Sequence, residues 1–390
     1  MKNNVLITYG WNRVAYNMCR ALAKEGIQVH VGDNSPLAMT RYSRYSHKFF
    51  TYPSFYQSPD KYIKFISQYA DQHQIECYLP VHEETFIASK YKSVLFQAGL
   101  KVPVDSLDKM KIFHLKDKSL ALAKQLGVRV PESIKPASFE DAKSFAEKYG
   151  FPVVIKTIQS NSAKGVFYAK NLEELSALWE SVKNSDFLLQ QYFAGHGYGV
   201  SVLANQGQIR AMFTHKRLVE KTYTGGTSVL RISTRNEELE EYTKKLVEHV
   251  KWHGVAMFEF KYNEETKNGC FIEINPRFWG SLALPLHAGI NFPYMLYRMA
   301  MDGDVEPQYD YKEGISVKWL LGSAIATVDK IRNKQWSKIF QTDYKVAGYD
   351  DLYWDDPLPF FMQSFYYLSK LIRTRNFNPS DESSFDINCL

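Results

Sequence analysis

The sequence predicts an α/β region that continues into an α+β region and ends in an aromatic C-terminal extension. Three observations support this fold class. Short apolar strands alternate with amphipathic helices over residues 1–107, which is typical of a parallel, doubly wound sheet. Over residues 108–304, later strands come in pairs across polar turns that contain glycine, which favours antiparallel hairpins. Over residues 305–390, aromatic residues are spread through basic, irregular sequence.

Composition indicates a globular protein of a reducing compartment. The 390 residues are 45% hydrophobic and 15% aromatic, enough for two or three buried cores. The four cysteines show no Cys-x-x-Cys spacing, which argues against a disulfide framework or a zinc site. The apolar run at the N-terminus is too short for a signal peptide, and no segment has the ~20 apolar residues that span a bilayer. We therefore expect a cytoplasmic protein.

The first region alternates strands and helices, expected at about 5–8, 14–24, 27–31, 60–73 and 77–81. Its first loop lacks Gly-x-Gly-x-x-Gly, so the dinucleotide fingerprint is absent. His82 and Glu83 follow the last strand, where open sheets bind ligands, and are candidates for substrate contact. Capping of the next helix is a comparable alternative for this acidic stretch. Residues 41–56 are basic and rich in tyrosine, but a loop covering the sheet edge is favoured over a nucleic-acid patch.

The second region contains features that suit phosphate groups, and the net charge of +6 also fits a protein that handles anions. Lys156 ends an apolar strand, and a polar loop follows at residues 159–165. Small residues in that loop let backbone N–H groups approach phosphate oxygens, and the hydroxyl and ammonium groups add further donors. The loop residues selected for this role are Ser160, Ser162, Lys164 and Gly165. We expect nucleotide phosphates here and no nucleic-acid partner.

Two apolar strands joined by a polar turn carry carboxylates where buried strands should carry none. The first contains Glu259, and the second contains Glu273 and Asn275. If the strands pair, the two glutamates lie side by side, and Asn275 shares their face because strands have a period of two. Oxygen ligands of this kind suit Mg²⁺, with Mn²⁺ as an alternative. The sequence therefore predicts a metal site on this hairpin.

These motifs, in this order, resemble the ATP-grasp superfamily over about residues 5–300, and the Glu-x-Asn-x-Arg segment that ends at Arg277 is the most specific part. The resemblance implies an ATP-grasp fold, with a pre-ATP-grasp domain at 1–107 and an ATP-grasp domain at 108–304. Its lid subdomain is expected at about 120–187 and its metal-binding subdomain at about 188–304.

The resemblance also assigns roles to residues. Lys118 and Lys156 would contact the ATP phosphates, with the loop 159–165 over them, and Arg277 would steady an acyl-phosphate. Gln190, Gln191, Tyr192 and Phe193 would form the hinge that reads adenine, although Gln191 stands where the family usually has glutamate. The glycine-rich segment after this hinge and the Thr-Gly-Gly-Thr-Ser segment at 224–228 are similar to those of carbamoyl-phosphate-synthase-like carboxylate–amine ligases.

The expected activity is an ATP-dependent ligase for a small carboxylate and an amine. Lys216 and Arg231 are predicted to assist Arg277 in holding the carboxylate and the transferred phosphoryl group. A carboxylase, a thiol-ligating enzyme and a nucleotide-binding regulator with little turnover remain alternatives.

The extension at 305–390 has no assigned role. Its apolar, aromatic run at 357–375 fits a helix docked on the protein, which we favour over an interfacial helix on a membrane. The sequence also allows a homodimer.

Overall fold

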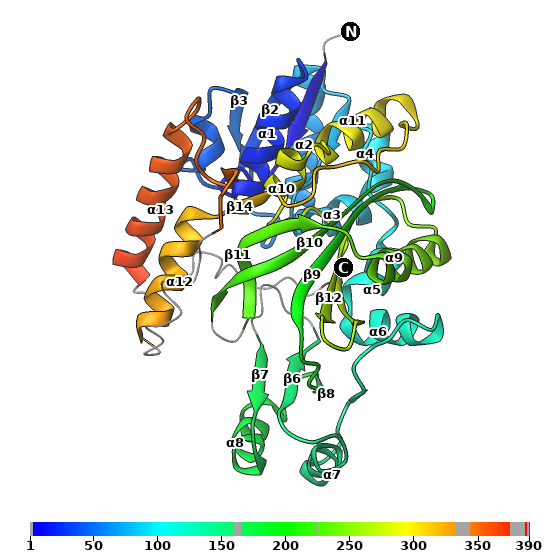
Figure 1. The fold of residues 1–390 in the computed structure, drawn as a ribbon. Coiled ribbons are helices and arrows are strands. Elements are labelled where there is room, and N and C mark those ends of the chain that lie inside the picture. The colour runs from blue at the N-terminus through cyan, green and yellow to red at the C-terminus, as the bar shows by residue number, and fades with distance from the viewer. Residues whose placement is uncertain (1–2, 159–164, 223–224, 333–343, 375–386, 388–389) are drawn as a thin grey trace.

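The computed structural model describes residues 3–158, 165–222, 225–332, 344–374, 387 and 390. Three sheets follow one another along the molecule (Figure 1). A parallel N-terminal sheet lies at the top, a long central sheet crosses the middle, and a small antiparallel sheet hangs below it. The predicted combination of an α/β region with an α+β region is confirmed.

The N-terminal sheet has the strand order β3-β2-β1-β4, and all its pairings are parallel. Its strands are β1 (Asn4–Ile7), β2 (Gln28–Asp33), β3 (Ser46–Thr51) and β4 (Cys77–Leu79). Helices α1 (Arg13–Lys24), α2 (Pro59–His73), α3 (Glu84–Lys90) and α4 (Lys92–Gln97) belong to this part. The basic segment 41–56 was predicted as a loop, but it contains β3 and the end of a 3-10 turn, η1 (Met39–Tyr42). Pairing with β2 makes β3 a strand despite its polar sequence.

A buried histidine makes this sheet sensitive to acid. His30 on β2 lies 3.0 Å from the Tyr69 hydroxyl, and the rings of His47 and His73 are each 5.3 Å away. Burial lowers the pKa of His30 to about 4, with further contributions from His47, His73 and Lys48. The folded protein therefore disfavours protonation that the unfolded chain accepts near pH 6.5. Stability from this group is present above that pH and is lost as pH falls towards 4.

We expect the free energy of unfolding to fall by about 2 kcal/mol between pH 7 and pH 5 through His30 alone. His30→Gln should weaken this acid dependence. His249→Gln, at an exposed position in the helix of residues 237–250, should leave it as in the wild type. Urea denaturation at both pH values measures the difference. An equal acid loss in His30→Gln and wild type would contradict the assignment.

The small sheet has the order β5-β8-β6-β7 and is antiparallel throughout. Its strands are β5 (Ser133–Ile134), β6 (Val153–Thr157), β7 (Val166–Ala169) and β8 (Phe187–Gln191). Helices α7 (Phe139–Tyr149) and α8 (Leu172–Val182) cover it. Phe145, Ile155 and Leu189 are among the residues of its own hydrophobic cluster. A separate core of this size allows the sheet to hold Lys156 and the hinge strand in fixed relation.

The central sheet has the order β13-β12-β9-β10-β11-β14-β15. Its strands are β9 (His196–Asn205), β10 (Gln208–Thr222), β11 (Gly225–Thr234), β12 (Gly254–Asn263), β13 (Asn268–Asn275), β14 (Ser316–Lys318) and β15 (Gly348–Tyr349). The segment at 224–228, which was singled out by its resemblance, belongs from Gly225 onwards to β11. There its backbone groups pair with β10, because the long strand β10 provides the partner.

Alternation along the central strands separates two hydrophobic clusters. Phe213, Val255 and Met257 pack with the N-terminal sheet, α10 (Ala283–Ala288) and α11 (Phe292–Asp302). Ala256 and Phe258 pack on the opposite face with α5 (Leu107–His114), α6 (Lys116–Gln125) and α9 (Glu237–Val250). A polar side chain on the first face therefore points towards the N-terminal sheet, because side chains on strands alternate.

The segment after residue 305 is more ordered than its sequence predicts. Strands β14 and β15 extend the central sheet, and helices α12 (Leu320–Arg332) and α13 (Leu358–Thr374) stand at one edge of the molecule (Figure 1). Of the helices that the structure describes, none combines the length and apolar character needed to cross a bilayer.

Candidate functional site

A cavity of about 250 Å³ lies where the three sheets meet. Arg13 and His82 line it from the N-terminal sheet, Lys156 from the small sheet, and Glu259 and Glu273 from the central sheet. Residues more than 250 positions apart in the chain therefore face one enclosed space. A polar cavity at the junction of sheets is the usual place for a small-molecule site.

The two carboxylates face each other as the hairpin sequence predicts. Glu259 on β12 is the direct partner of Glu273 on β13 in the antiparallel register. A bulge follows Glu259, and Phe258 and Ile274 on either side point into the opposite core. Asn275 donates from its side-chain nitrogen to Glu259 Oε1 at 3.1 Å. The hairpin thus presents two carboxylates and one amide to the cavity.

Electrostatics differ between the two glutamates. Burial raises the pKa of Glu259, and Glu273 adds to this, although Arg217 opposes it with an ion pair of 2.7 Å. At Glu273, burial also disfavours ionisation, but Lys116, Lys156 and Arg217 outweigh it and lower the pKa. Glu259 therefore carries the less compensated negative charge, and a cation placed between the two carboxylates would relieve it.

The hairpin fits Mg²⁺ by the chemistry of its donors. Glu259, Glu273 and Asn275 offer oxygen atoms, which Mg²⁺ prefers, and leave room for water and phosphate oxygens as the remaining ligands. In the part of the chain that the structure describes, no group of three or more His, Cys, Asp or Glu residues could hold a metal ion. A metal ion here would therefore depend on the amide of Asn275 or on a bound nucleotide to complete its ligands.

Two lysines approach the carboxylates. Lys156, at the end of β6, is buried, and burial lowers its pKa to about 8, while Glu273 favours its charged form. Lys116, the first residue of α6, lies with Nζ 3.6 Å from Glu273 Oε2. The predicted partner, Lys118, is exposed, whereas Lys116 is buried, and neither side chain lines the cavity. Residues two positions apart on a helix point about 200° apart around its axis, so Lys116 and Lys118 cannot both face Glu273. We therefore correct the choice to Lys116.

The loop 159–165 is described only at its end. Ser160, Ser162 and Lys164 lie outside the described residues. Gly165 is described and precedes β7, with φ at +73°. A Cβ atom there would lie 2.1 Å from Thr157 Oγ1, so this position requires glycine. Gly165 does not line the cavity itself, but its carbonyl accepts from Thr157 N at 2.9 Å and closes the loop beside Lys156.

The predicted hinge lines the cavity as a group: Gln190, Gln191, Tyr192 and Phe193. Gln190 is buried and donates to Ser133 Oγ at 3.0 Å, so its side chain ties β8 to β5. Gln191 ends β8, and Tyr192 is 43% exposed. Strand β8 ends at Gln191, so residues 192 and 193 lie beyond its ladder, and their contact with adenine stays a prediction.

Comparison with known proteins agrees with this geometry. Residues 183–322 match the family described as ATP-grasp in the biosynthetic pathway with Ter operon. N5-carboxyaminoimidazole synthetase from Staphylococcus aureus, solved with ADP, has a TM-score of 0.66 at 17% identity and matches 85% of this chain and 86% of that chain. The biotin carboxylase domain of Hydrogenobacter thermophilus 2-oxoglutarate carboxylase, solved with MgADP, ADP and bicarbonate, has a TM-score of 0.65 at 18% identity, covering 80% and 73%. The chain therefore has an ATP-grasp fold, and its residues 183–322 match an ATP-grasp family.

Relatives of this ATP-grasp chain catalyse different reactions. D-alanine–D-alanine ligase of Fusobacterium nucleatum is 29% identical over 139 residues, 35% of this chain and 45% of that protein. The arginine-specific carbamoyl phosphate synthase large chain of Geobacillus stearothermophilus is 29% identical over 176 residues, 42% of this chain and 17% of that protein. The chain spans less than half the length of each relative. The proteins that this chain is similar to therefore include ligases and carboxylases.

Strand alternation corrects one predicted residue of the ATP-grasp site. Lys216 was chosen as a catalytic cation, but it lies outside the cavity lining and pairs with Glu264. Its neighbour Arg217 lines the cavity and pairs with Glu259. Phe213 and Arg217 lie four positions apart on β10 and therefore share one face. Lys216 lies an odd number of positions from each and points to the opposite face. The sequence alone could not show which of the two, Lys216 or Arg217, lies on the face of β10 that lines the cavity.

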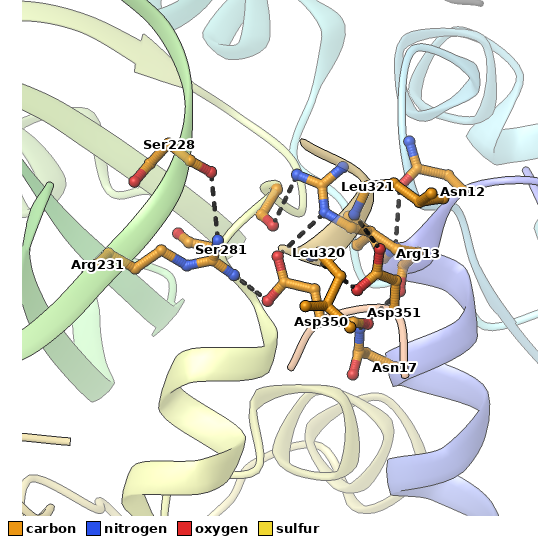
Figure 2. Close-up of polar contacts among 12 residues, drawn as sticks. Asn12, Arg13, Asn17, Ser228, Arg231, Ser281, Leu320, Leu321, Asp350 and Asp351 are labelled. Carbon is orange, nitrogen blue, oxygen red and sulfur yellow. Dashed lines mark hydrogen bonds and ion pairs between the residues drawn. The ribbon is translucent and has the colours of Figure 1, made fainter. Parts of the chain in front are cut away.

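Arg231 is also displaced from its predicted role. Its side chain is fully buried, does not line the cavity, and pairs with Asp350 (Figure 2). The other Asp350 oxygen accepts from Arg13 Nε at 3.2 Å, and Arg13 also donates to the Gly280 carbonyl at 3.2 Å. The guanidinium of Arg13 lies 3.8 Å from the Trp319 ring centre. Arg231 therefore supports Arg13, which does line the cavity.

The N-terminal end of the cavity is polar and basic. Arg277 lines it and donates to the Phe278 carbonyl at 2.8 Å and to Asn275 Oδ1 at 3.2 Å. His82 stacks on Tyr9 with ring centres 4.6 Å apart, and its buried Nδ1 has no hydrogen-bond partner among the described residues. Burial, followed by Arg277, lowers the pKa of His82 well below its ordinary value. A neutral imidazole between cations can accept a hydrogen bond from a bound ligand.

Proposed function

We propose that this ATP-grasp protein is an ATP-dependent ligase that activates a carboxylate as an acyl-phosphate and joins it to an amine. One observation carries the proposal: the cavity that contains Glu259, Glu273 and Lys156 is also lined by Arg13 and His82 of the N-terminal sheet. A nucleotide and a second substrate can therefore meet in one enclosed space. We further propose that residues 120–187 form the lid subdomain and 188–304 the metal-binding subdomain.

In the first step, the substrate carboxylate attacks the γ-phosphorus of ATP, a C–O–P linkage forms, and ADP leaves. Lys116 and Lys156 are close enough to Glu273 to hold phosphate oxygens beside the carboxylates. Glu259, Glu273 and Asn275 would hold Mg²⁺, which would supply positive charge to offset that of the phosphate oxygens. In this scheme the protein binds and orients the reactants, so it needs no covalent nucleophile of its own.

In the second step, the amine attacks the acyl carbon, the C–N bond forms, and phosphate leaves as the nitrogen loses a proton. Arg277 lies beside Asn275 and can hold the transferred phosphoryl group by charge-assisted hydrogen bonds. Arg13 and His82 line the same cavity and face the acceptor from the N-terminal sheet. Water is kept from the acyl-phosphate to the extent that the small sheet covers the cavity.

ADP release with a panel of carboxylates, each alone, with amines or with bicarbonate, tests the proposal. A ligase forms an amide only when carboxylate and amine are both present, and hydroxylamine should trap the acyl-phosphate as a hydroxamate. ADP release that requires bicarbonate instead would support a carboxylase, as in the biotin carboxylase whose fold is similar. No release above that of Glu273→Ala would support a nucleotide-binding protein with little turnover.

Lys116→Met and Lys118→Met form a matched pair on α6. Lys116→Met should lower kcat/KM for ATP by about 10- to 100-fold, because a charge-assisted contact to a phosphate is worth roughly 1.5–3 kcal/mol. Lys118→Met should leave it unchanged, because that side chain is exposed outside the cavity. Steady-state kinetics at saturating second substrate measures both, and a larger loss in Lys118→Met would restore the original assignment.

A further inference from the structure

Helix α13 presents an apolar stripe to solvent. The stripe consists of residues spaced 3, 4, 3 and 4 positions apart: Leu358 (50% exposed), Phe361 (60%), Phe365 (56%), Leu368 (55%) and Ile372 (73%). This spacing keeps them along one side of the helix, because an α-helix turns 100° per residue. Exposed apolar residues in a continuous line, unlike scattered ones, indicate a contact surface.

The other side of α13 holds the helix on the protein. Gln363 is buried, and Tyr366 approaches Trp11 with ring centres 6.4 Å apart. The helix also packs against η1. The favoured prediction of a docked helix is therefore correct for this side. It leaves the stripe unexplained, because docking alone requires apolar residues only on the buried side.

Trp354 lies four residues before α13 and is a further exposed apolar side chain. It is 83% exposed, although both of its neighbours are anchored. Tyr353 hydrogen-bonds Asn17, and Asp355 pairs with Arg20 at 2.8 Å. The backbone therefore holds this indole in water. Tryptophan is enriched where proteins meet the headgroup region of a bilayer, since its ring is apolar and its N–H is polar.

Charge near the stripe favours an anionic partner. The sequence of α13 contains Lys370 and Arg373 and no Asp or Glu. The exposed Arg41 belongs to η1, which packs against α13, and the exposed Arg44 follows η1 and donates to the Asp355 carbonyl at 3.3 Å. These arginines belong to the basic segment that the catalytic site does not use. A helix with an apolar stripe and basic flanks is the pattern of an interfacial, membrane-surface helix.

The dimensions of the stripe argue against a second copy of the chain. From Leu358 to Ile372 the helix advances about 21 Å, and a helix is about 10 Å wide, so the stripe offers about 200 Å². A stable protein interface buries about 800 Å² on each partner. A lipid surface has no such requirement, because apolar side chains enter it individually from a helix that lies flat.

We propose that the α13 stripe binds the surface of a membrane that contains anionic lipids. The basic residues would face the headgroups, and Phe361 and Phe365 at the centre of the stripe would enter the acyl boundary. The protein would then be a peripheral membrane protein with its nucleotide cavity facing the aqueous phase. This inference does not depend on the ligase proposal.

Vesicle flotation with the full chain tests it. Wild type should float with vesicles of phosphatidylcholine and phosphatidylglycerol in equal parts, and less with phosphatidylcholine alone. F361E/F365E should reduce the bound fraction about tenfold or more, because each substitution replaces a ring that would enter the acyl boundary by a charge. Phe96→Glu, at an apolar position 75% exposed on α4, is the matched control and should bind as wild type.

Three results would overturn the proposal. The first is equal flotation of wild type and F361E/F365E, and the second is no flotation of wild type with anionic vesicles. The third is a wild-type dimer in light scattering that F361E/F365E converts to a monomer, which would assign the stripe to contact between copies. Thermal unfolding of each variant verifies that these exposed positions leave the fold intact.

Discussion

Glu273→Gln is expected to lower the rate of ATP turnover by about 10²- to 10³-fold, the largest effect on activity predicted for this protein. Glu273 is the partner of Glu259 across the hairpin, and its Oε2 lies 3.6 Å from Lys116 Nζ. Glutamine keeps the shape of the side chain but removes the charge that would hold both the metal ion and the lysine. The loss should appear in kcat more than in KM for ATP, because charge develops in the transition state.

Glu264→Gln is the matched control for this prediction. Glu264 lies in the turn of the same hairpin, where it accepts a hydrogen bond from the Tyr198 hydroxyl at 2.9 Å and pairs with Lys216, outside the cavity lining. Its turnover should equal that of wild type. ADP release at several Mg²⁺ concentrations measures both variants. Turnover in Glu273→Gln within threefold of wild type, roughly 0.6 kcal/mol, would contradict the proposed metal site.

Asp350→Asn is expected to destabilise the fold by about 3–5 kcal/mol, the largest effect on stability. Asp350 is fully buried and pairs with both Arg13 and Arg231, of which Arg231 is also fully buried (Figure 2). Asparagine leaves two guanidinium groups in the interior without a negative partner. Burial already lowers the pKa of Arg13, and Arg231 adds to that, while Asp350 opposes both. Removing this anion therefore exposes the full cost of burying the cations.

Asp351→Asn is the control for this experiment, because it changes the adjacent residue in the same way. Asp351 accepts from the backbone N–H groups of Leu320 and Leu321, each at 3.1 Å, at the start of α12 (Figure 2). Asparagine keeps one of these acceptors, so about 1 kcal/mol should be lost. Denaturant unfolding compares the two variants. Equal losses would show that the arginines do not depend on Asp350 for their charge balance.

The Asp350 variant also tests how the C-terminal segment serves the cavity. Arg13 lines the cavity, and its Nε is held by Asp350 from a position more than 330 residues later in the chain. If Asp350→Asn folds at low temperature, its KM for the second substrate should rise more than its KM for ATP, because Arg13 lies at the N-terminal end of the cavity, away from the lysines. An equal rise in both would point to a general structural effect.

Local patterns identified the hairpin that carries the two carboxylates. Glu259 and Glu273 stand out from the sequence because charged residues interrupt apolar strands, and a short turn leaves few ways to pair the strands. Their register was therefore predictable, and the structure confirms it. The parallel N-terminal sheet was predictable for a similar reason, since alternating strands and helices permit few topologies.

Neighbouring cations could not be distinguished in this way. Lys116 and Lys118 differ only in which side of α6 they occupy, and Lys216 and Arg217 differ only in which face of β10 they occupy. In each pair, the residue that reaches the carboxylates of the hairpin depends on which side the rest of the protein covers. The sequence around these residues contains no signal for that choice, because both members of each pair are basic.

The sequence by itself determined the fold class and the carboxylate hairpin, because each depends on residues close together in the chain. Only the tertiary structure decided which lysine and arginine pair with the two carboxylates, that Arg231 pairs with Asp350, and that one side of α13 remains exposed. These depend on burial by segments hundreds of residues away, since solvent exclusion and ion pairing act through space. Local spacing sets the possible faces of an element, and packing selects the one that is used.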